Sequence, residues 1–292
     1  MDDEGLYECP MPESFRDKLS ITLFLAWLFY LGFVSRVIFG PLMPEIQKDL
    51  GLSNGEAGSL FFLLAVGYML APVCSGLLSS RINHLGTLKL SAWLVGIALA
   101  CCIWVENFWG MGVLLLLVGF AGSLHIPSAI ATITAEIQQS DWGKGLSVHQ
   151  CAPPLSFVSA PLIAAILSQW LNWREILGCW AIIALVSALL YTFLGKGGQF
   201  PGRVINWQNI QKIGRLPSFW LLAILFSLAM AGNAGIFAML PLFLVSERGF
   251  ELGVANTLIG FSQLSGIVAI FFAGIIVDKF GQKRVIWFSL LC

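Results

Sequence analysis

Charged side chains are scarce in this 292-residue sequence, where Asp, Glu, Lys and Arg make up 11% of the residues and hydrophobic residues 58%. An ordinary soluble domain carries about 25% charged residues, so the scarcity excludes a typical soluble globule. The 16 basic and 16 acidic residues cancel. A chain without net positive charge is poorly suited to the nucleic-acid backbone, which argues against a nucleic-acid partner.

Motifs that carry chemistry are absent as well. The sequence contains no phosphate-binding loop, no cluster of metal ligands and no Ser-His-Asp set in a supporting context. We therefore expect no enzyme, no metal site and no cofactor. The seven cysteines lie mostly inside apolar runs without metal-type spacing, and we interpret them as small hydrophobic residues.

Long apolar runs dominate what is present. Each has about 18 residues or more, enough to cross a hydrocarbon core of roughly 30 Å. The predicted spans are 20–43, 57–79, 88–105, 108–133, 146–169, 175–194, 219–245 and 254–277. A ninth run begins near Ile286. The first run follows an acidic flank and lacks a cleavage site, so we interpret it as a retained helix rather than a signal peptide. The fold class is therefore an all-α membrane protein.

Basic residues are distributed unevenly between the loops. With the N-terminus in the cytoplasm, all but four of them fall on the cytoplasmic side; Lys48, Arg174 and Arg248 lie opposite, and Arg36 lies inside a span. The positive-inside rule then predicts a cytoplasmic N-terminus and a multi-pass protein of the inner membrane. The lipid bilayer is thus one expected partner.

The loops predict four regions. Residues 1–19 form an acidic cytoplasmic tail, and 20–194 form a complete six-helix bundle. Residues 195–217 form a polar, Gly-rich, basic loop between two halves. Residues 218–292 form a partial second bundle, with two complete helices and the start of a third.

Two related basic hinges indicate that the halves are a duplication. Gly-Ile-Ile-Val-Asp-Lys-Phe-Gly-Gln-Lys-Arg begins at Gly274, and a degraded copy begins 198 residues earlier at Gly76. Pro44 and Pro241, which we expect to end the first and seventh helices, lie 197 residues apart. Such paired halves are typical of secondary transporters.

The order of helices, the hinge after the second helix and Trp173-Arg174 at the sixth resemble the major facilitator superfamily, from about residue 20 onward. The most specific element is the second hinge, where the family's positions are occupied by Gly274, Asp278, Lys279, Gly281, Lys283 and Arg284. Arg36, followed eight residues later by Pro44, resembles the anion:cation symporter branch. The resemblance implies a twelve-helix bundle, of which this chain would be a C-terminally truncated part.

Arg36 is the main candidate for substrate binding. Inserting an arginine at the centre of a membrane helix costs roughly 2.5–3.5 kcal/mol on insertion scales, so we expect a binding partner that offsets this free energy. Gly32 and Gly40 lie on its helical face and would leave room for a ligand. A guanidinium in a low-dielectric cavity suits a carboxylate or phosphate. The alternative is an arginine that reaches the outer headgroups. The resemblance implies the first role.

Three further polar residues are candidates for orienting a substrate: His125, Gln150 and Asn233. Asn233 is the counterpart of Arg36 in the second half. His125 and His149 are also candidates for proton coupling, because a histidine titrates near physiological pH. Hydrogen bonding between helices is the alternative for each. The family's acidic residue before the first-helix arginine is replaced here by Ser35, so any coupled proton would have to be carried by a histidine or by a helix absent from this chain.

The hinges are expected to be mechanical, latching one arrangement of the halves. The gating residues are Gly76, Arg81, Gly274, Asp278, Lys279, Gly281, Lys283 and Arg284. In the first copy Ser80 replaces the acid and Asn83 replaces a glycine, so its latch should be the weaker one.

The leading hypothesis is a secondary active transporter that carries a small organic anion by alternating access. It would act as a symporter or antiporter, with H⁺ or Na⁺ as the coupling ion, and would be a monomer at full length. The alternative is a truncated, non-transporting membrane remnant or a split half that needs a missing C-terminal part. A sensor on a transporter scaffold is a third class, which would require an output domain.

Overall fold

The computed structural model describes residues 15–202 and 207–264; within them, the side chains of 15–17, 207–210, 226 and 229–234 are outside the description. The described elements are α1 (Phe15–Val37), α2 (Phe39–Leu50), α3 (Asn54–Cys102), α4 (Phe108–Glu136), the 3₁₀ turn η1 (Gln139–Asp141), α5 (Trp142–Gln150), α6 (Ala152–Leu167), α7 (Trp173–Leu194), α8 (Trp207–Gly214) and α9 (Pro217–Ser246). Residues 252–264 are also helical.

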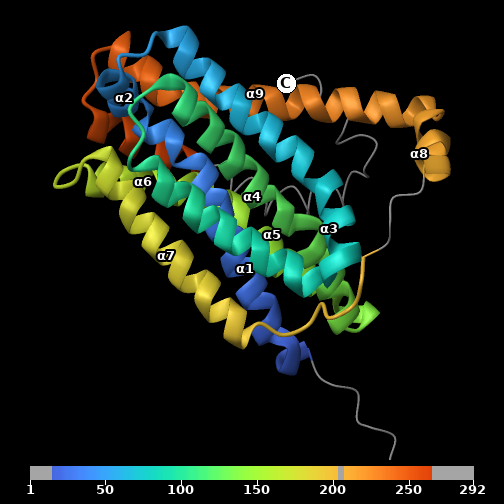
Figure 1. Ribbon diagram of the computed structural model, residues 1–292. Coiled ribbons are helices and arrows are strands. Elements are labelled where there is room, and N and C mark those ends of the chain that lie inside the picture. Colours follow the sequence, from blue (N-terminus) through green and yellow to red (C-terminus); the bar gives the residue numbers. More distant parts are fainter. Residues whose placement is uncertain (1–14, 203–206, 265–292) are drawn as a thin grey trace, which may run out of the picture.

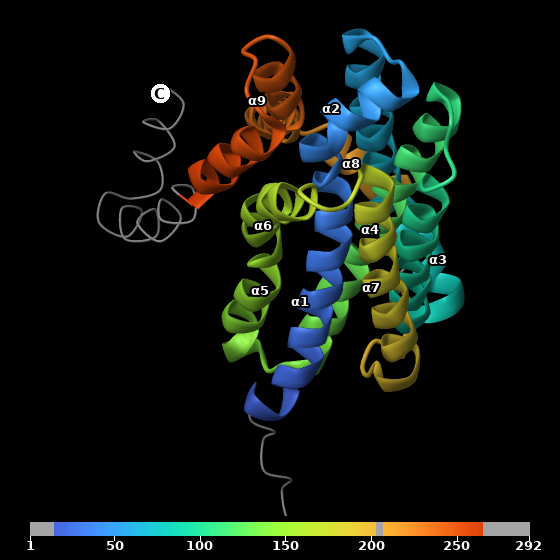
Figure 2. The same cartoon turned by 90° about the vertical axis from the view of Figure 1, so that its left-hand side faces the viewer.

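The elements from α1 to α7 form one bundle, in which α1 contacts α3, α4, α5, α6 and α7 (Figures 1 and 2). We call the end where α1 begins the α1 end, and the end where α2 finishes the α2 end. The largest group of buried apolar side chains includes Phe29, Leu42, Leu115 and Leu177, and a smaller group around Tyr191 lies nearer the α1 end.

Five helical stretches among the described residues are long and apolar enough to cross a membrane: Lys18–Leu50, Asn54–Cys102, Phe108–Glu136, Gln139–Leu167 and Trp173–Leu194. They cover the six spans predicted for the first half. The spans 57–79 and 88–105 lie in one helical run, because α3 contains a single non-helical residue, Asn83. The all-α prediction is therefore confirmed.

The helix starts follow local rules. Ser53 caps α3, and Asn172 caps α7; each forms a capping box with the glutamate three residues later, Glu56 or Glu175. Asn107 accepts from the backbone of Gly110 at the start of α4. At the end of α2, Gly51 adopts a left-handed conformation with φ 63°, which a glycine does at little cost.

The two helix-ending prolines were predicted wrongly. α2 continues through Pro44 to Leu50, and α9 continues through Pro241 to Ser246. A proline removes one backbone hydrogen-bond donor from a helix. In a packed membrane bundle this loss costs less than ending the helix, because a broken helix would leave several backbone groups unpaired in lipid. The first span instead divides two residues after Arg36, at Ile38 between α1 and α2.

Glycines bring helices into close contact. A Cβ atom on Gly67 of α3 would lie 2.0 Å from the Leu116 carbonyl oxygen of α4, and one on Gly119 of α4 would lie 2.1 Å from the Leu64 carbonyl oxygen of α3. Such distances leave no room for any side chain. The two backbones can pack directly against each other because both positions are glycine.

Beyond the first bundle the chain continues into α8 and α9. The predicted loop 195–217 thus contains a short helix, α8. Figure 1 shows α9 running from α8, at the edge of the molecule, to the α2 end. There α9 packs on α2, and the side-chain amide of Asn256 donates from Nδ2 to the Pro41 carbonyl oxygen at 3.1 Å. The halves therefore meet at the α2 end.

Candidate functional site

Arg36 lies in the last turn of α1 and is half-buried. Its guanidinium carbon is 4.3 Å from the ring centroid of Tyr68 in α3 and 5.2 Å from that of Phe33. Among the described residues no carboxylate pairs with this arginine. The charge thus lies against two aromatic rings, without a carboxylate counter-ion among the described residues.

A cavity of about 290 Å³ opens beside Arg36. Its described lining comes from α1, α3, α6 and α9, so both halves contribute to it. Phe157 of α6 and Phe237 of α9 face each other across this region in an edge-to-face contact with centroids 4.7 Å apart. Sequence reasoning missed Tyr68, Phe157 and Phe237, although Tyr68 was visible as a tyrosine inside the span 57–79.

The two glycines near Arg36 have a different role from the one predicted. A Cβ atom on Gly32 would lie 3.4 Å from the Gly122 Cα atom of α4, and one on Gly40 would lie 3.3 Å from the Ala238 carbonyl oxygen of α9. Both positions are filled by neighbouring helices. They permit helix packing, and the space for a ligand lies elsewhere around Arg36.

His125 of α4 and His149 of α5 form a buried pair. Their Nε2 atoms are 3.3 Å apart, and their rings are nearly parallel at 8°. Phe29 of α1 stacks on both rings, with centroids 4.5 Å from His149 and 5.8 Å from His125. Nδ1 of His149 is buried with no hydrogen-bond partner among the described residues. The pair is one polar unit inside the first half.

The predicted substrate group is therefore only partly brought together. Neither histidine lines the cavity beside Arg36, and Gln150 is exposed. Asn233 lies in α9, but its side chain is outside the described residues. Arg36 and the histidine pair are linked indirectly: Phe33 contacts the guanidinium, Phe29 lies 5.8 Å from Phe33, and Phe29 stacks on His149.

The first hinge lies where α3 bends. Gly76 and the exposed Arg81 are both helical, and Asn83 alone departs from helical geometry, with φ 61° and ψ 174°. The second hinge, with its residues Gly274, Asp278, Lys279, Gly281, Lys283 and Arg284, lies outside the described residues.

Residues 195–202, which we call the strap, bind along the first hinge. Gly202 donates to the Ser79 carbonyl at 2.9 Å, Leu85 donates to the Gly198 carbonyl at 2.8 Å, and His84 donates to the Phe200 carbonyl at 3.3 Å. Three backbone hydrogen bonds thus join the strap to the first hinge.

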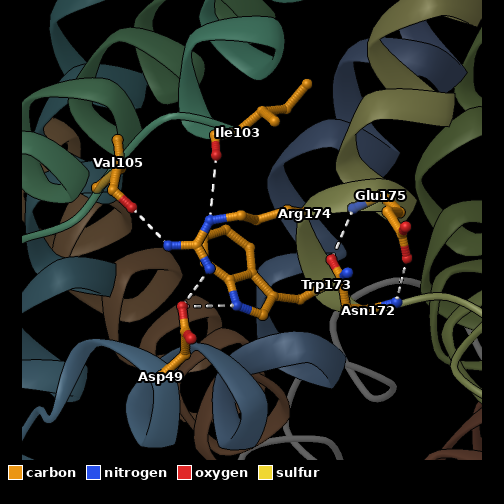
Figure 3. A network of polar contacts seen from close by, with 7 residues as sticks. All are labelled: Asp49, Ile103, Val105, Asn172, Trp173, Arg174 and Glu175. Carbon is orange, nitrogen blue, oxygen red and sulfur yellow. Dashed lines mark hydrogen bonds and ion pairs between the residues drawn. The ribbon is translucent and has the colours of Figure 1, made fainter.

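At the α2 end a polar network ties α2 and α7 to the loop between α3 and α4 (Figure 3). Arg174 of α7 pairs with Asp49 of α2, and its other nitrogens donate to the carbonyl oxygens of Ile103 at 3.1 Å and Val105 at 2.7 Å. Trp173 donates to Asp49 at 3.3 Å. This network joins elements of the first half only, so it stiffens that half without touching the cavity.

Comparison with known families gives one match that spans nearly the whole chain. A family model described as the Major Facilitator Superfamily matches residues 22–292.

Curated relatives share low identity over most of the chain. Membrane sensor protein UhpC of Escherichia coli (strain K12) is 24% identical over 281 residues, covering 88% of this chain and 64% of the relative. The probable sulfoacetate transporter SauU of Cupriavidus necator is 18% identical, covering 94% of this chain and 68% of the relative. The probable nitrate/nitrite antiporter NarK1 of Thermus thermophilus is 22% identical, covering 94% and 64%. The chain thus spans about two thirds of the length of these relatives.

Solved structures share the fold. A bacterial homolog of the human lysosomal transporter Spinster, in an inward-facing and unoccupied conformation, superposes with a TM-score of 0.75 at 17% identity, covering 93% of this chain and 64% of that chain. A D-xylose–proton symporter superposes with a TM-score of 0.68 at 16% identity, covering 91% and 70%. Identities this low support the bundle architecture alone.

Proposed function

Because the chain belongs to the major facilitator superfamily, we propose that it is part of a secondary transporter that carries a small organic anion by alternating access. The observation that carries the anion proposal is Arg36. Its guanidinium lies inside a membrane span, beside a cavity of about 290 Å³, with no carboxylate partner among the described residues.

An arginine in this position is costly unless an opposite charge reaches it. Removing a cation from water costs several kcal/mol, and a desolvated aromatic contact returns about 2 kcal/mol of this cost. A carboxylate can instead accept two parallel N–H bonds from the guanidinium fork. A bound anion would therefore supply what the resting site lacks, and the site would favour anions over neutral solutes.

The names of two relatives agree with this substrate class, since sulfoacetate, nitrate and nitrite are all anions. The buried histidine pair, His125 and His149, is the proposed site of proton coupling. Gln150 and Asn233 remain proposed contacts for the substrate. The distribution of basic residues supports a cytoplasmic N-terminus in an inner membrane.

A substrate sensor is a second candidate, because one relative is named as a membrane sensor protein. A sensor would bind the same anion at Arg36 without moving it across the bilayer. Binding and flux must therefore be measured separately.

The test is anion binding by the purified full chain, together with uptake into proteoliposomes, for the wild type and Arg36→Ala. We expect R36A to weaken anion binding by at least about 30-fold, which corresponds to roughly 2 kcal/mol for one member of a desolvated charge pair. Arg36→Lys should recover only part of the loss, since an ammonium lacks the planar fork.

Arg248→Ala is the matched control, because Arg248 is exposed and lies outside the cavity. It should bind and transport like the wild type. Anion binding that is unchanged in R36A would refute the proposed role of Arg36 in binding the anion. Arg36-dependent binding without uptake would favour the sensor over the carrier.

A further inference from the structure

Among the described residues, the lining of the cavity beside Arg36 is almost entirely apolar. Arg36 is the one charged residue among its described lining residues, and the others are aliphatic, aromatic or glycine. Four of them are phenylalanines: Phe61 and Phe62 of α3, Phe157 of α6 and Phe237 of α9. The site therefore offers one cationic group and a wall of rings.

The rings form a connected series that starts at the guanidinium. Phe33 lies 5.2 Å from the guanidinium carbon, and its centroid is 5.5 Å from that of Phe157. Phe157 in turn contacts Phe237 edge to face, at 80°. The series crosses from the first half to the second. A ligand held at Arg36 would consequently have ring edges and faces along its body.

This lining determines what kind of anion the site can hold. A second negative charge, or a body rich in hydroxyl groups, would lose its water without gaining hydrogen bonds from the described wall. An apolar body would gain contact with several rings at no such cost. Resting on the proposed function, we propose that the substrate is a monoanion with an aromatic body, of the arylcarboxylate class.

The size of the cavity agrees with a single ring. Ligand pockets for drug-sized molecules range upward from about 300 Å³, and this cavity is close to that lower limit at about 290 Å³. The proposal thus departs from the compact, polar anions in the names of two relatives. The difference follows from this chain's own phenylalanines.

The test is binding of four carboxylates to the purified full chain in nanodiscs: benzoate, cyclohexanecarboxylate, acetate and succinate. We expect benzoate to bind at least about tenfold more tightly than acetate, because each added apolar group in a fitted pocket contributes about that factor or more. Cyclohexanecarboxylate should fall between them, since it keeps the size and loses the ring face. Succinate, with a second charge, should bind no more tightly than acetate.

Variants locate the effect in the cavity. Phe157→Leu and Phe237→Leu keep an apolar side chain and should bring benzoate affinity closer to acetate affinity. Phe193→Leu is the control, because Phe193 is 78% exposed on α7, away from the cavity. It should leave the benzoate preference unchanged.

The outcomes separate the two proposals. If acetate and succinate bind in an Arg36-dependent manner and benzoate binds no more tightly, the arylcarboxylate class is wrong while the anion site stands. If R36A leaves the binding of all four unchanged, the anion site itself is wrong. A benzoate preference that survives in F157L and F237L would place the ring elsewhere and overturn the assignment of this wall.

Discussion

Asn83 holds a backbone conformation that is unusual for any residue except glycine. Its φ of 61° and ψ of 174° lie in a region that costs of order 1–3 kcal/mol for other residues. Its side chain offsets part of this cost, because Oδ1 accepts a hydrogen bond from the Gly86 backbone at 2.8 Å. Asn83 thus caps the second segment of α3 while it provides the bend between two spans.

Substitution at Asn83 should separate these two contributions. Asn83→Ala loses the cap and keeps the backbone penalty, so we expect it to lower the free energy of unfolding by about 1 kcal/mol. Asn83→Gly also loses the cap but removes the penalty, and it should be the more stable of the two. Thermal unfolding of the purified protein in detergent measures both. An N83A variant as stable as the wild type would show that the bend is determined by tertiary packing alone.

The histidine pair makes a prediction about pH. With the two Nε2 atoms 3.3 Å apart, one nitrogen must donate and the other accept, and a second proton would oppose two donors. The Phe29 ring stacks on both histidines. If the pair carries the coupled proton, the initial uptake rate should rise as the external pH falls.

His149→Phe tests this role while keeping a ring against Phe29. We expect H149F to retain anion binding and to lose the pH dependence of the initial uptake rate. His84→Gln is the matched control, since His84 bonds to Ser128 and belongs to the hinge region. A pH profile in H149F that matches the wild type would remove the pair from coupling.

Individual residues could be predicted only where the sequence itself isolates them. Arg36 stands out because charge is scarce in an apolar run. Its ring partners do not, because Tyr68 and Phe237 come from other helices and their registers against α1 depend on packing. The His125–His149 contact likewise joins α4 and α5, and these helices are connected by η1. The sequence pattern does not specify the geometry of that connection.

At the scale of elements, the contact between α3 and α4 depends on glycine. Gly67→Ala or Gly119→Ala would place a methyl group about 2 Å from a backbone carbonyl oxygen of the other helix. We expect each variant to lose roughly 1–3 kcal/mol of stability, as overpacked cores do. Gly143→Ala in α5 is the control, because nothing lies within 4 Å of its Cβ position. The measurement is the Tm of each variant in detergent, and equal Tm values for G119A and G143A would contradict the close contact.

The number of spans could be predicted better than their ends. Apolar length alone located the spans of the first half, because the hydrocarbon thickness sets a minimum. The helix ends predicted at Pro44 and Pro241 were wrong, because a proline ends a helix in water more readily than inside a packed bundle. The sequence also did not predict that the second and third spans lie in one helical run that is interrupted only at Asn83. A hinge motif indicates a bend, but it does not specify how many residues form the bend.

For the whole molecule, the contact between the halves is the feature that alternating access must break. It is formed at the α2 end by Gly40 against Ala238, by Gly260 against Leu162, and by the hydrogen bond from Asn256 to Pro41. We call these contacts the seam. Asn256 is fully buried there, and its Oδ1 atom has no hydrogen-bond partner among the described residues. The duplication predicted two halves, but no single-sequence pattern could predict which ends touch.

Asn256→Asp should open the seam. The substitution replaces the donating amide with a carboxylate, so two acceptors would face each other where Nδ2 now bonds to the Pro41 carbonyl. A buried charge without a partner costs several kcal/mol, which is enough to favour an arrangement in which water reaches this position. Asn256→Ala only deletes one hydrogen bond and should shift the arrangement less, by about 1 kcal/mol.

The opening can be measured as the rate at which an impermeant maleimide labels Ala238→Cys, above the rate for the parent protein with its native cysteines. Ala238 packs against Gly40 in the closed seam, so its labelling should be slow with Asn256 and several-fold faster with N256D. Asn54→Asp is the matched control: it adds the same charge at the α2 end but keeps the Oδ1 atom that accepts from Gln47. Equal labelling rates in N256D and N54D would mean that the seam does not govern access, because the same charge change would then act equally on and off the contact between the halves.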